Sequence, residues 1–524
     1  MTDTPDLTGR GKRDVDEADA DDVRRLHELG YAQELRRGMS GFSNFAVSFS
    51  IICVLSGCLT LYGFGMNTGG PAVMTWGWPI VGIFTLTVGL GMAEVCSSYP
   101  TAGGLYYWAA KLARRNAPAW AWFTGWFNFL GQVAVTAGID FGLAQFVLAY
   151  LNLQFGLANT PVNTITVYGV MLLVHALLNV GGVRVVAVLN NVSVWWQVLG
   201  VLIVVAALAL VPSKHQSATF VFTHVVNNTG WSSTFYVALL GLLVAQYTMT
   251  GFDASAHMTE ETTNAARSGP KGIVNSIIVS LIAGWILLIG VTFAIGDYDQ
   301  QLATPTGVPP VQIFLDAIGA TGGKLLLLIV IGAQFFCGMS SVTANSRMIY
   351  AFSRDKGLPG SKVWHQINAR TRTPTNAVWL ASGGAFILGL PYLINATAYA
   401  AVTSIAVIGL YIAYVIPVFL RVRQGDGFTR GPWHLGCWSK LVGIIAVSWV
   451  VIITVLFMLP QSNPITVNSF NYAPIAVLVV LGFAGGYWLL SARKWFTGPV
   501  VQGSAEELAA IERDLKLEAE EPRA

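Results

Sequence analysis

The sequence predicts an all-α polytopic membrane protein with about twelve transmembrane helices, and three observations lead to this fold class. First, 54% of the 524 residues are hydrophobic and only 11% are charged, whereas an average soluble domain carries about 25% charged residues. Second, the hydrophobic residues form about twelve runs, and a membrane-spanning helix needs about 20 such residues. Third, no segment between two runs reaches the size of a soluble domain, about 50 residues or more. Continuous apolar runs also exclude a membrane β-barrel.

The chain begins with a polar tail, residues 1–41. Its acidic start predicts a disordered segment. From residue 23 to residue 39 the leucines Leu26, Leu29 and Leu35 stand among Arg and Glu, which is typical of an amphipathic segment. We expect this segment to lie along the inner membrane surface. The tail lacks the apolar core and cleavage site of a secretory signal, so we expect it to stay on the side where it is made.

The apolar runs follow in order and divide the chain into a ten-helix transport core, residues 42–420, and two additional transmembrane helices, residues 421–494. The runs cover residues 42–66, 72–97, 118–149, 163–181, 185–211, 234–258, 272–295, 323–350, 375–394, 397–420, 441–460 and 472–492. A second tail, residues 495–524, has helical spacing of Glu, Leu and Lys, and we assign it no chemistry. With the N-terminus inside, 28 Lys and Arg lie on the inner side and two lie outside. Both termini are therefore expected in the cytoplasm, at the plasma membrane.

Composition and motifs exclude several function classes. The net charge of +3 provides no basic surface for nucleic acid. The five cysteines are widely spaced and show no metal-ligand pattern, so we expect neither a metal site nor a cofactor. A phosphate-binding loop, a zinc-protease motif and a nucleophile elbow are absent from the sequence, which argues against an ATP-driven pump and against an enzyme.

Two runs carry interruptions that a simple span does not need. One is Leu55-Ser56-Gly57-Cys58 in the first run, and the other is Thr248 to Asp253 in the sixth run. Glycine in a helix costs about 1 kcal/mol against alanine, although packing glycines are common in membrane helices. Paired interruptions in corresponding helices are a sequence indication of a transporter site. Unwound segments expose N–H groups at one half-helix end and C=O groups at the other, and a zwitterion satisfies both.

Four stretches then show a family resemblance: Gly41 to Ala46, Ser97 to Trp108, Gly251 to Glu261 and Ser346 to Asp355. Together they resemble the amino acid, polyamine and organocation (APC) permeases, in their amino acid/choline transporter branch, over about residues 26–421. The resemblance implies a five-plus-five inverted repeat and alternating access to a midplane site between the first and sixth helices. It implies a secondary transporter of an amino acid or of 4-aminobutyrate. A choline or polyamine transporter and a transporter-like nutrient sensor stay open as alternatives.

By position, the resemblance also implies the site residues. The backbone N–H groups of Ser56, Gly57 and Cys58 would meet a substrate carboxylate. The carbonyl groups around the second break would receive its amino group, and this break contains Tyr247, Thr248, Thr250, Gly251 and Phe252. Tyr247 and Phe252 either gate the ligand or pack in the core. An aromatic box of Trp122, Trp126 and Tyr247 would suit choline.

Three acidic residues lie inside the runs, where a charge needs a partner or water. Asp140 shares a helix face with Trp122 and Trp126, and we expect this face to look inward. Asp140 either takes part in substrate binding or ion coupling, or it lies near the outer mouth of the pathway. Asp253 begins the second half of the broken helix, where capping is the expected role. Glu94 is expected to anchor a loop or close the inner gate.

Ion coupling, by sodium or by a proton, is the remaining expectation. Ser340 and Ser341 lie in the eighth run beside Gln334 and Asn345. Their hydroxyls either help to bind sodium or bond back to their own helix. Some relatives that the resemblance suggests carry a lysine in the fifth helix, and this chain has Gln197 there. His175 in the fourth run is expected to be structural.

Overall fold

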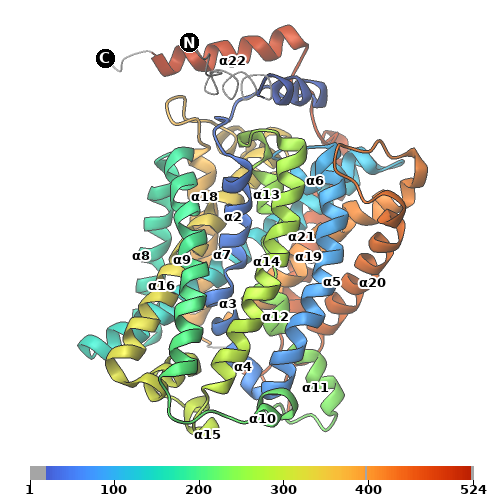
Figure 1. Cartoon of the computed structure of the whole chain (residues 1–524). Helices are drawn as coiled ribbons and strands as arrows, with labels where there is room; N and C mark the ends of the chain where they lie inside the picture. The colour runs from blue at the N-terminus through green and yellow to red at the C-terminus, as the bar shows by residue number, and fades with distance from the viewer. Residues whose placement is uncertain (1–18, 396–397, 521–524) are drawn as a thin grey trace, which may run out of the picture.

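The computed structural model describes residues 19–395 and 398–520, and over this range the chain is a bundle of long helices (Figure 1). Its described part contains three isolated β-bridges and no β-strand. Eleven of the described helices are long and apolar enough to span a membrane, and a shorter apolar helical segment covers Thr234–Thr248. That segment belongs to the sixth run, which is broken. The expectation of about twelve spans is therefore confirmed.

The spans follow the runs in order. The first run becomes α2 (Gly41–Ile52), α3 (Val54–Thr60) and α4 (Tyr62–Asn67), and the sixth becomes α11 (Thr234–Gly241), α12 (Leu243–Thr248) and α13 (Ala254–His257). The others are α5 (Gly70–Ser98), α7 (Ala117–Phe155), α8 (Pro161–Val180), α9 (Val183–Leu210), α14 (Ala265–Phe293), α16 (Pro309–Arg354), α18 (Thr375–Gly389), α19 (Ala398–Gln424), α20 (Ser439–Met458) and α21 (Ala473–Leu490). Short helices join them: α6 (Gly104–Leu112), α10 (Ala218–Thr223), η1 (Thr259–Glu261), α15 (Tyr298–Leu302), α17 (Ser361–Trp364) and η2 (Leu390–Leu393).

The bundle has two distinct ends. The helical segment of residues 19–29 and the last helix, α22 (Ala505–Glu520), lie at one end, which we call the terminal end (Figure 1). Helices α10, α11 and α15 lie at the opposite end, which we call the far end. Helix α2 starts at the terminal end, so α3 and α4 continue toward the far end. Helices α11 and α12 run the other way, and α13 continues their path toward the terminal end.

Helix α7 forms the centre of the bundle. It has 39 residues, which at 1.5 Å per residue is about 58 Å and exceeds the bilayer core of about 30 Å. It packs against α19, α16, α8 and α18, and 83% of its apolar window is buried, against 17% for the peripheral α21. The low burial of α21 means that its outer surface meets lipid.

The first break lies earlier than its sequence suggested. The expected interruption, residues 55–58, is helical, and the chain leaves the helix at Cys53 instead, with φ 43° and ψ 65°. This left-handed conformation is uncommon for a residue with a side chain. Contacts hold it in place, because the Cys53 thiol lies 2.8 Å from the Ser56 hydroxyl and 3.3 Å from the Ala333 carbonyl oxygen.

The N-terminal tail also differs from expectation. Residues 19–29 are helical, but Leu26 is 2% exposed and Leu35 is not exposed at all. The apolar face therefore packs into the terminal end of the bundle, which leaves it unavailable to a membrane surface. Helix α22 covers this tail, because Glu512 accepts hydrogen bonds from the backbone of Gln33 and contacts His27 at 2.8 Å. Of the acidic start that predicted disorder, residues 14–18 lie outside the described residues, whereas Asp19, Asp21 and Asp22 are helical, so the prediction is wrong there.

Candidate functional site

The two helix breaks cross in the middle of the bundle. A Cβ atom on Gly251 would lie 2.1 Å from Ile51 Cγ2, and a Cβ atom on Gly57 would lie 2.6 Å from Thr248 Cγ2. Both separations are far below van der Waals contact, so only glycine allows this approach. Ser48 fixes the crossing because its hydroxyl donates to the Phe252 carbonyl at 2.9 Å and accepts from the Ser255 N–H at 2.9 Å.

Opposite helix ends meet at this crossing. The start of α3 offers N–H groups, and the end of α12 offers C=O groups, so a positive and a negative dipole end lie together. At the start of α3, Ser56 and Gly57 already donate to the Cys53 carbonyl, at 3.1 and 2.7 Å. The first N–H groups of a helix have no intrahelical acceptor. Val54 and Leu55 are therefore the donors closest to the break, and Cys58 lies within the helix.

The carbonyl groups of the second break are partly occupied. The Thr250 hydroxyl donates to the Tyr247 carbonyl at 2.7 Å, and the Thr250 N–H donates to the Thr248 carbonyl at 2.9 Å. Tyr411 of α19 donates to the Met249 carbonyl at 2.6 Å. Each carbonyl oxygen keeps a second lone pair. The break thus presents a fixed set of backbone acceptors.

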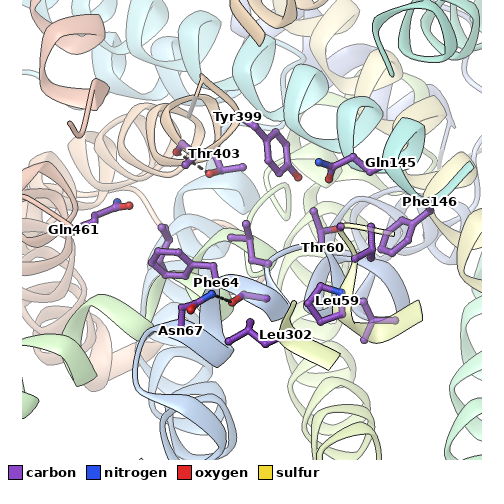
Figure 2. Close-up of a pocket in the computed structure, with 17 residues that line it drawn as sticks. Leu59, Thr60, Phe64, Asn67, Gln145, Phe146, Leu302, Tyr399, Thr403 and Gln461 are labelled. Atoms are coloured by element: carbon purple, nitrogen blue, oxygen red, sulfur yellow. Dashed lines mark hydrogen bonds between the residues drawn. The ribbon is translucent and has the colours of Figure 1, made fainter. Parts of the chain in front are cut away.

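A cavity of about 310 Å³ opens next to α3 and α12 on the far-end side. Its polar lining comes from Thr60, Asn67, Gln145, Thr403 and Gln461, and none of the lining residues that the structure describes is charged. Figure 2 shows the side chains of Tyr399, Gln145 and Thr60 pointing toward one another. A neutral, polar lining suits a solute whose charges cancel.

Two tyrosines separate this cavity from the breaks. The Tyr399 ring lines the cavity and stacks on Phe141 at 4.8 Å, and its hydroxyl lies 3.4 Å from the Gly138 carbonyl oxygen. The Tyr247 hydroxyl approaches the same glycine and the Tyr399 hydroxyl, and among the described residues it makes no hydrogen bond of good geometry. A buried hydroxyl without a partner is costly, so Tyr247 is available to a ligand. Phe252 is different, since it packs between Tyr411 and Tyr414.

Between the breaks and the terminal end, buried ion pairs close the bundle. Arg347 pairs with Glu261 at 2.7 Å and Arg354 pairs with Glu260 at 2.9 Å. Glu94 pairs with Arg421 at 3.2 Å and accepts hydrogen bonds from the Leu435 N–H and the Ser439 hydroxyl. Glu94 thus anchors the segment between α19 and α20.

The N-terminal tail adds a second layer at this end. The Arg354 guanidinium lies 3.8 Å from the centre of the Tyr31 ring, close enough for a cation–π interaction. The hydroxyls of Tyr31 and Tyr106 both donate to Asp355, at 2.8 and 2.7 Å. Burial raises the pKa of the Asp355 carboxyl, although Arg354 opposes the shift. Together these contacts cover the terminal side of the site.

Asp253 does not cap the second half of the broken helix, so the expected role is wrong. Its side chain makes no capping hydrogen bond to α13. It accepts instead from Gln132 of α7 at 2.7 Å and from the Tyr414 hydroxyl at 2.6 Å, and it lies 3.3 Å from His257. The carboxylate is therefore held by α7 and α19 and not by the N–H groups of its own helix.

The other intramembrane polar residues bond to side chains and carbonyl groups of neighbouring helices. Asp140 is fully buried and pairs with His175 of α8 at 2.7 Å. Gln197 donates to Ser193 at 3.2 Å. Ser340 and Ser341 point to different neighbours, because Ser340 donates to Asn190 and back to the Phe336 carbonyl, whereas Ser341 contacts Thr136 of α7. These two hydroxyls therefore do not converge on one ion.

The aromatic box expected for choline is not formed. The Trp122 indole donates to the Ala484 carbonyl of α21 at 2.9 Å, and Trp126 packs edge-on against Phe483 at 5.2 Å. This face of α7 looks toward the peripheral α21, whereas Tyr247 contacts Gly138 from the opposite direction. Helical spacing showed correctly that the two tryptophans share a face, but it did not reveal which helix covers that face.

Sequence reasoning missed four residues of this region: Cys53, Tyr399, Tyr414 and His257. Cysteine is not typical of the left-handed conformation, so the sequence carried no signal for Cys53. Tyr399 and Tyr414 reach the site from a helix more than 140 residues away in sequence, and periodicity does not report such contacts. His257 was visible inside the Gly251 to Glu261 stretch, four residues after Asp253, a spacing that places both on one helix face.

Comparison with known proteins gives a consistent result. A family model described as "Amino acid permease" matches residues 39–481. The chain is 47% identical over 494 residues to the "Amino-acid permease BAT1" of Arabidopsis thaliana, an alignment that covers 91% of this chain and 96% of the relative. It is 47% identical to the homologous permease of Oryza sativa subsp. japonica, over 91% of this chain and 95% of the relative. It is 33% identical to the "GABA-specific permease" of Saccharomyces cerevisiae, over 95% and 90%.

Proposed function

The chain belongs to the amino acid permease family, and on that premise we propose that it is a secondary active transporter that works by alternating access. Membership of the family makes it a multi-pass membrane protein of amino acid transport and not an enzyme. The driving mechanism, the substrate within the class and the direction of movement belong to the proposal.

One observation carries the proposal: the breaks cross between a cavity on the far-end side and a closed terminal end. The cavity measures about 310 Å³, and the ion pairs Arg347–Glu261 and Arg354–Glu260 close the opposite side. Alternating access requires a site that opens to one side while the other is shut, and a cavity on one side with ion pairs on the other supports such a cycle. Separation of those pairs, together with closure of the cavity, would produce the opposite state.

We assign recognition to backbone groups of the two breaks. The substrate carboxylate meets the start of α3. The N–H groups of Val54 and Leu55 are the main donors, and those of Ser56, Gly57 and Cys58 come next along the helix. The substrate's amino group meets the carbonyls of Tyr247, Thr248 and Thr250. Gly251 keeps the two breaks close, and the Tyr247 hydroxyl is free to bind the ligand. Because the backbone recognises the charged groups, the substrate's own side chain is selected by the cavity.

The preferred substrates are amino acids and 4-aminobutyrate. The neutral cavity lining supports a zwitterion, and one relative is named as a GABA-specific permease. Choline is disfavoured because Trp122 and Trp126 pack on α21. The bias of Lys and Arg toward the terminal end supports cytoplasmic termini, and we place the protein in the plasma membrane.

Transport by purified protein in liposomes tests the proposal. The vesicles receive labelled amino acids, 4-aminobutyrate, choline and spermidine in separate experiments, with sodium and proton gradients imposed one at a time. We expect saturable uptake of at least one amino acid or 4-aminobutyrate, and competition among the amino compounds that bind. Choline uptake without amino acid uptake would overturn the substrate assignment. Binding of an amino acid without any movement would indicate a sensor and would overturn the transport proposal.

A further inference from the structure

Two aspartate–histidine pairs are buried in the described part of the bundle, and they differ in what they connect. Asp140 and His175 join α7 to α8, next to Gly338 of α16. Asp253 and His257 lie on α13 and its cap, directly between the second break and the closed terminal end. All four side chains are fully buried. Only the second of these pairs lies between the substrate site and the ion pairs Arg347–Glu261 and Arg354–Glu260, which we call the terminal gate.

A series of contacts runs from the second break to the ion pair Arg354–Glu260 through this pair. It starts where the Gly251 N–H donates to the Tyr414 hydroxyl at 3.2 Å, and that hydroxyl donates to Asp253 at 2.6 Å. His257 lies next to Asp253 and bonds through Nδ1 to the Ala102 carbonyl oxygen at 2.9 Å. The Ala102 N–H then donates at 2.9 Å to Glu260, the partner of Arg354. Hydrogen bonds thus link the break to Asp253 and His257 to the terminal ion pair, and the Asp253–His257 contact at 3.3 Å joins the two parts.

The chemistry of the neighbours gives His257 two protonation states. A carbonyl oxygen only accepts, so the bond to Ala102 requires a proton on Nδ1. In the neutral ring Nε2 accepts from the Asn128 amide at 3.2 Å. In the imidazolium Nε2 donates, and the Asp253 oxygen at 3.3 Å is the acceptor. The Asn128 Oδ1 atom has no partner in the described structure, so a rotated amide also accepts from the charged ring.

The charge of the pair changes with that proton. With neutral His257, Asp253 carries an uncompensated negative charge inside the membrane, held by the Gln132 and Tyr414 donors. With the imidazolium, the pair is neutral overall. An unpaired buried charge is expensive, so proton binding stabilises the closed arrangement in which the His257 ring lies against the 99–104 loop. Opening of the terminal end removes the Ala102 carbonyl and admits water to the ring.

We propose that His257, with Asp253 as its counter-charge, is the proton site that couples transport to a proton gradient. This inference rests on the proposed transport function. A proton binds Nε2 while the terminal end is closed and leaves to terminal-side water when Ala102 separates from the ring. The acceptor of the released proton is water or buffer, so the step requires no other reactant.

The groups that face the pair do not provide a competing proton carrier of the same kind. From α7 come only the amides of Asn128 and Gln132, and from α19 comes the Tyr414 phenol. On the loop side, Glu260 is held in its pair with Arg354. The Asp140–His175 pair faces Gly338 of α16 and Phe335, and its recorded bonds do not lead to the terminal gate.

The test compares His257→Gln with His175→Gln, an equally buried histidine in the other pair. Both variants and the unchanged protein are placed in liposomes with an internal pH-sensitive dye and with the membrane potential clamped. In the unchanged protein and in His175→Gln, we expect substrate to carry protons inward. With one proton per substrate, a gradient of one pH unit supports accumulation of up to about tenfold. His257→Gln should abolish both the substrate-dependent entry of protons and the accumulation driven by the pH gradient. Exchange of labelled for unlabelled substrate without a gradient should remain detectable.

The outcomes separate this inference from the function on which it rests. Absence of substrate exchange in the unchanged protein refutes transport itself. Exchange in the unchanged protein with no response to a pH gradient, or accumulation driven by sodium alone, refutes only the proton site. Proton coupling that survives in His257→Gln also refutes it, and so does coupling lost in His175→Gln alone. If His257→Gln shows no exchange, Asp253→Asn is measured in the same way, and intact proton coupling there overturns the assignment.

Discussion

Replacement of Gly57 by alanine perturbs the crossing of the two breaks directly. The added Cβ atom would lie 2.6 Å from Thr248 Cγ2 and 3.2 Å from the Ile52 carbonyl oxygen. Carbon atoms normally rest at about 3.5–4.0 Å, so α3 and α12 have to separate by about 1 Å. Separation moves the N–H groups of α3 away from the carbonyls of α12. The site then fits a zwitterion less well although each helix remains intact.

The magnitude follows from the cost of overpacking. One extra methyl group in a tightly packed core costs about 1–3 kcal/mol, and 1.4 kcal/mol corresponds to about tenfold in an equilibrium constant. We expect uptake of the preferred amino acid to fall between about fivefold and 100-fold in Gly57→Ala. Gly57→Leu should abolish uptake because its larger side chain has no space next to Thr248.

The assay is initial-rate uptake into liposomes, normalised to the amount of inserted protein. The matched control is Gly383→Ala in α18, where an added Cβ meets nothing within 4 Å. That control should retain uptake, since alanine is the better helix former. Uptake at the unchanged level in Gly57→Ala, with the structure otherwise folded, would refute the reasoning that the two breaks must touch at this glycine.

Four further predictions follow from the same geometry. Tyr399→Ala should raise the KM for uptake by about tenfold or more, because it removes the ring between the cavity and the breaks. Tyr399→Phe loses only one long hydrogen bond worth about 1 kcal/mol, so it should change the KM less than about fivefold. Equal effects of the two variants would exclude a role for the ring. Arg354→Ala should destabilise the closed terminal end by about 3–5 kcal/mol, because Glu260 stays buried without its partner, and faster hydrogen exchange of residues 99–106 would show it. Burial raises the pKa of Asp355, so the folded chain holds this proton more tightly than the unfolded chain. The stabilising contribution of the proton is complete below the ordinary pKa and declines as the pH rises through the raised value. In thermal unfolding, the unchanged protein should therefore gain stability relative to Asp355→Asn on acidification from pH 7 to pH 4, and a pH-independent difference would contradict this. Deletion of residues 504–524 removes Glu512 and should speed hydrogen exchange of residues 27–33, unless α22 contributes nothing to the docking of the tail.

Length and hydropathy were sufficient to predict the spans, because the energetic cost of exposing polar groups to lipid acts on each helix separately. The same local signal located the second break, where Gly251 has a φ of 85° that favours glycine. It misplaced the first, because Gly57 serves close approach and the backbone turns at Cys53. The two functions of glycine, a left-handed turn and close packing, are identical in a sequence.

Contacts between distant helices were beyond prediction from one sequence. The spacing of Asp253 and His257 was visible, but the donors Gln132 and Tyr414 are more than 120 residues away. The same limit explains the tryptophans of α7. Their common face was predicted from helical spacing, while the identity of the helix that covers it depends on how the bundle closes.

The two chain ends are tied to each other by backbone pairing, since Gln502 donates from its N–H to Gly30 at 2.9 Å and its side-chain oxygen accepts from the Ala32 N–H at 2.8 Å. The Val500 N–H also reaches Asp355, 3.0 Å away. Modification or capture of either tail would therefore disturb the other as well. A purification tag has the same consequence, because a bulky fusion at one tail would strain the contacts that join the two tails.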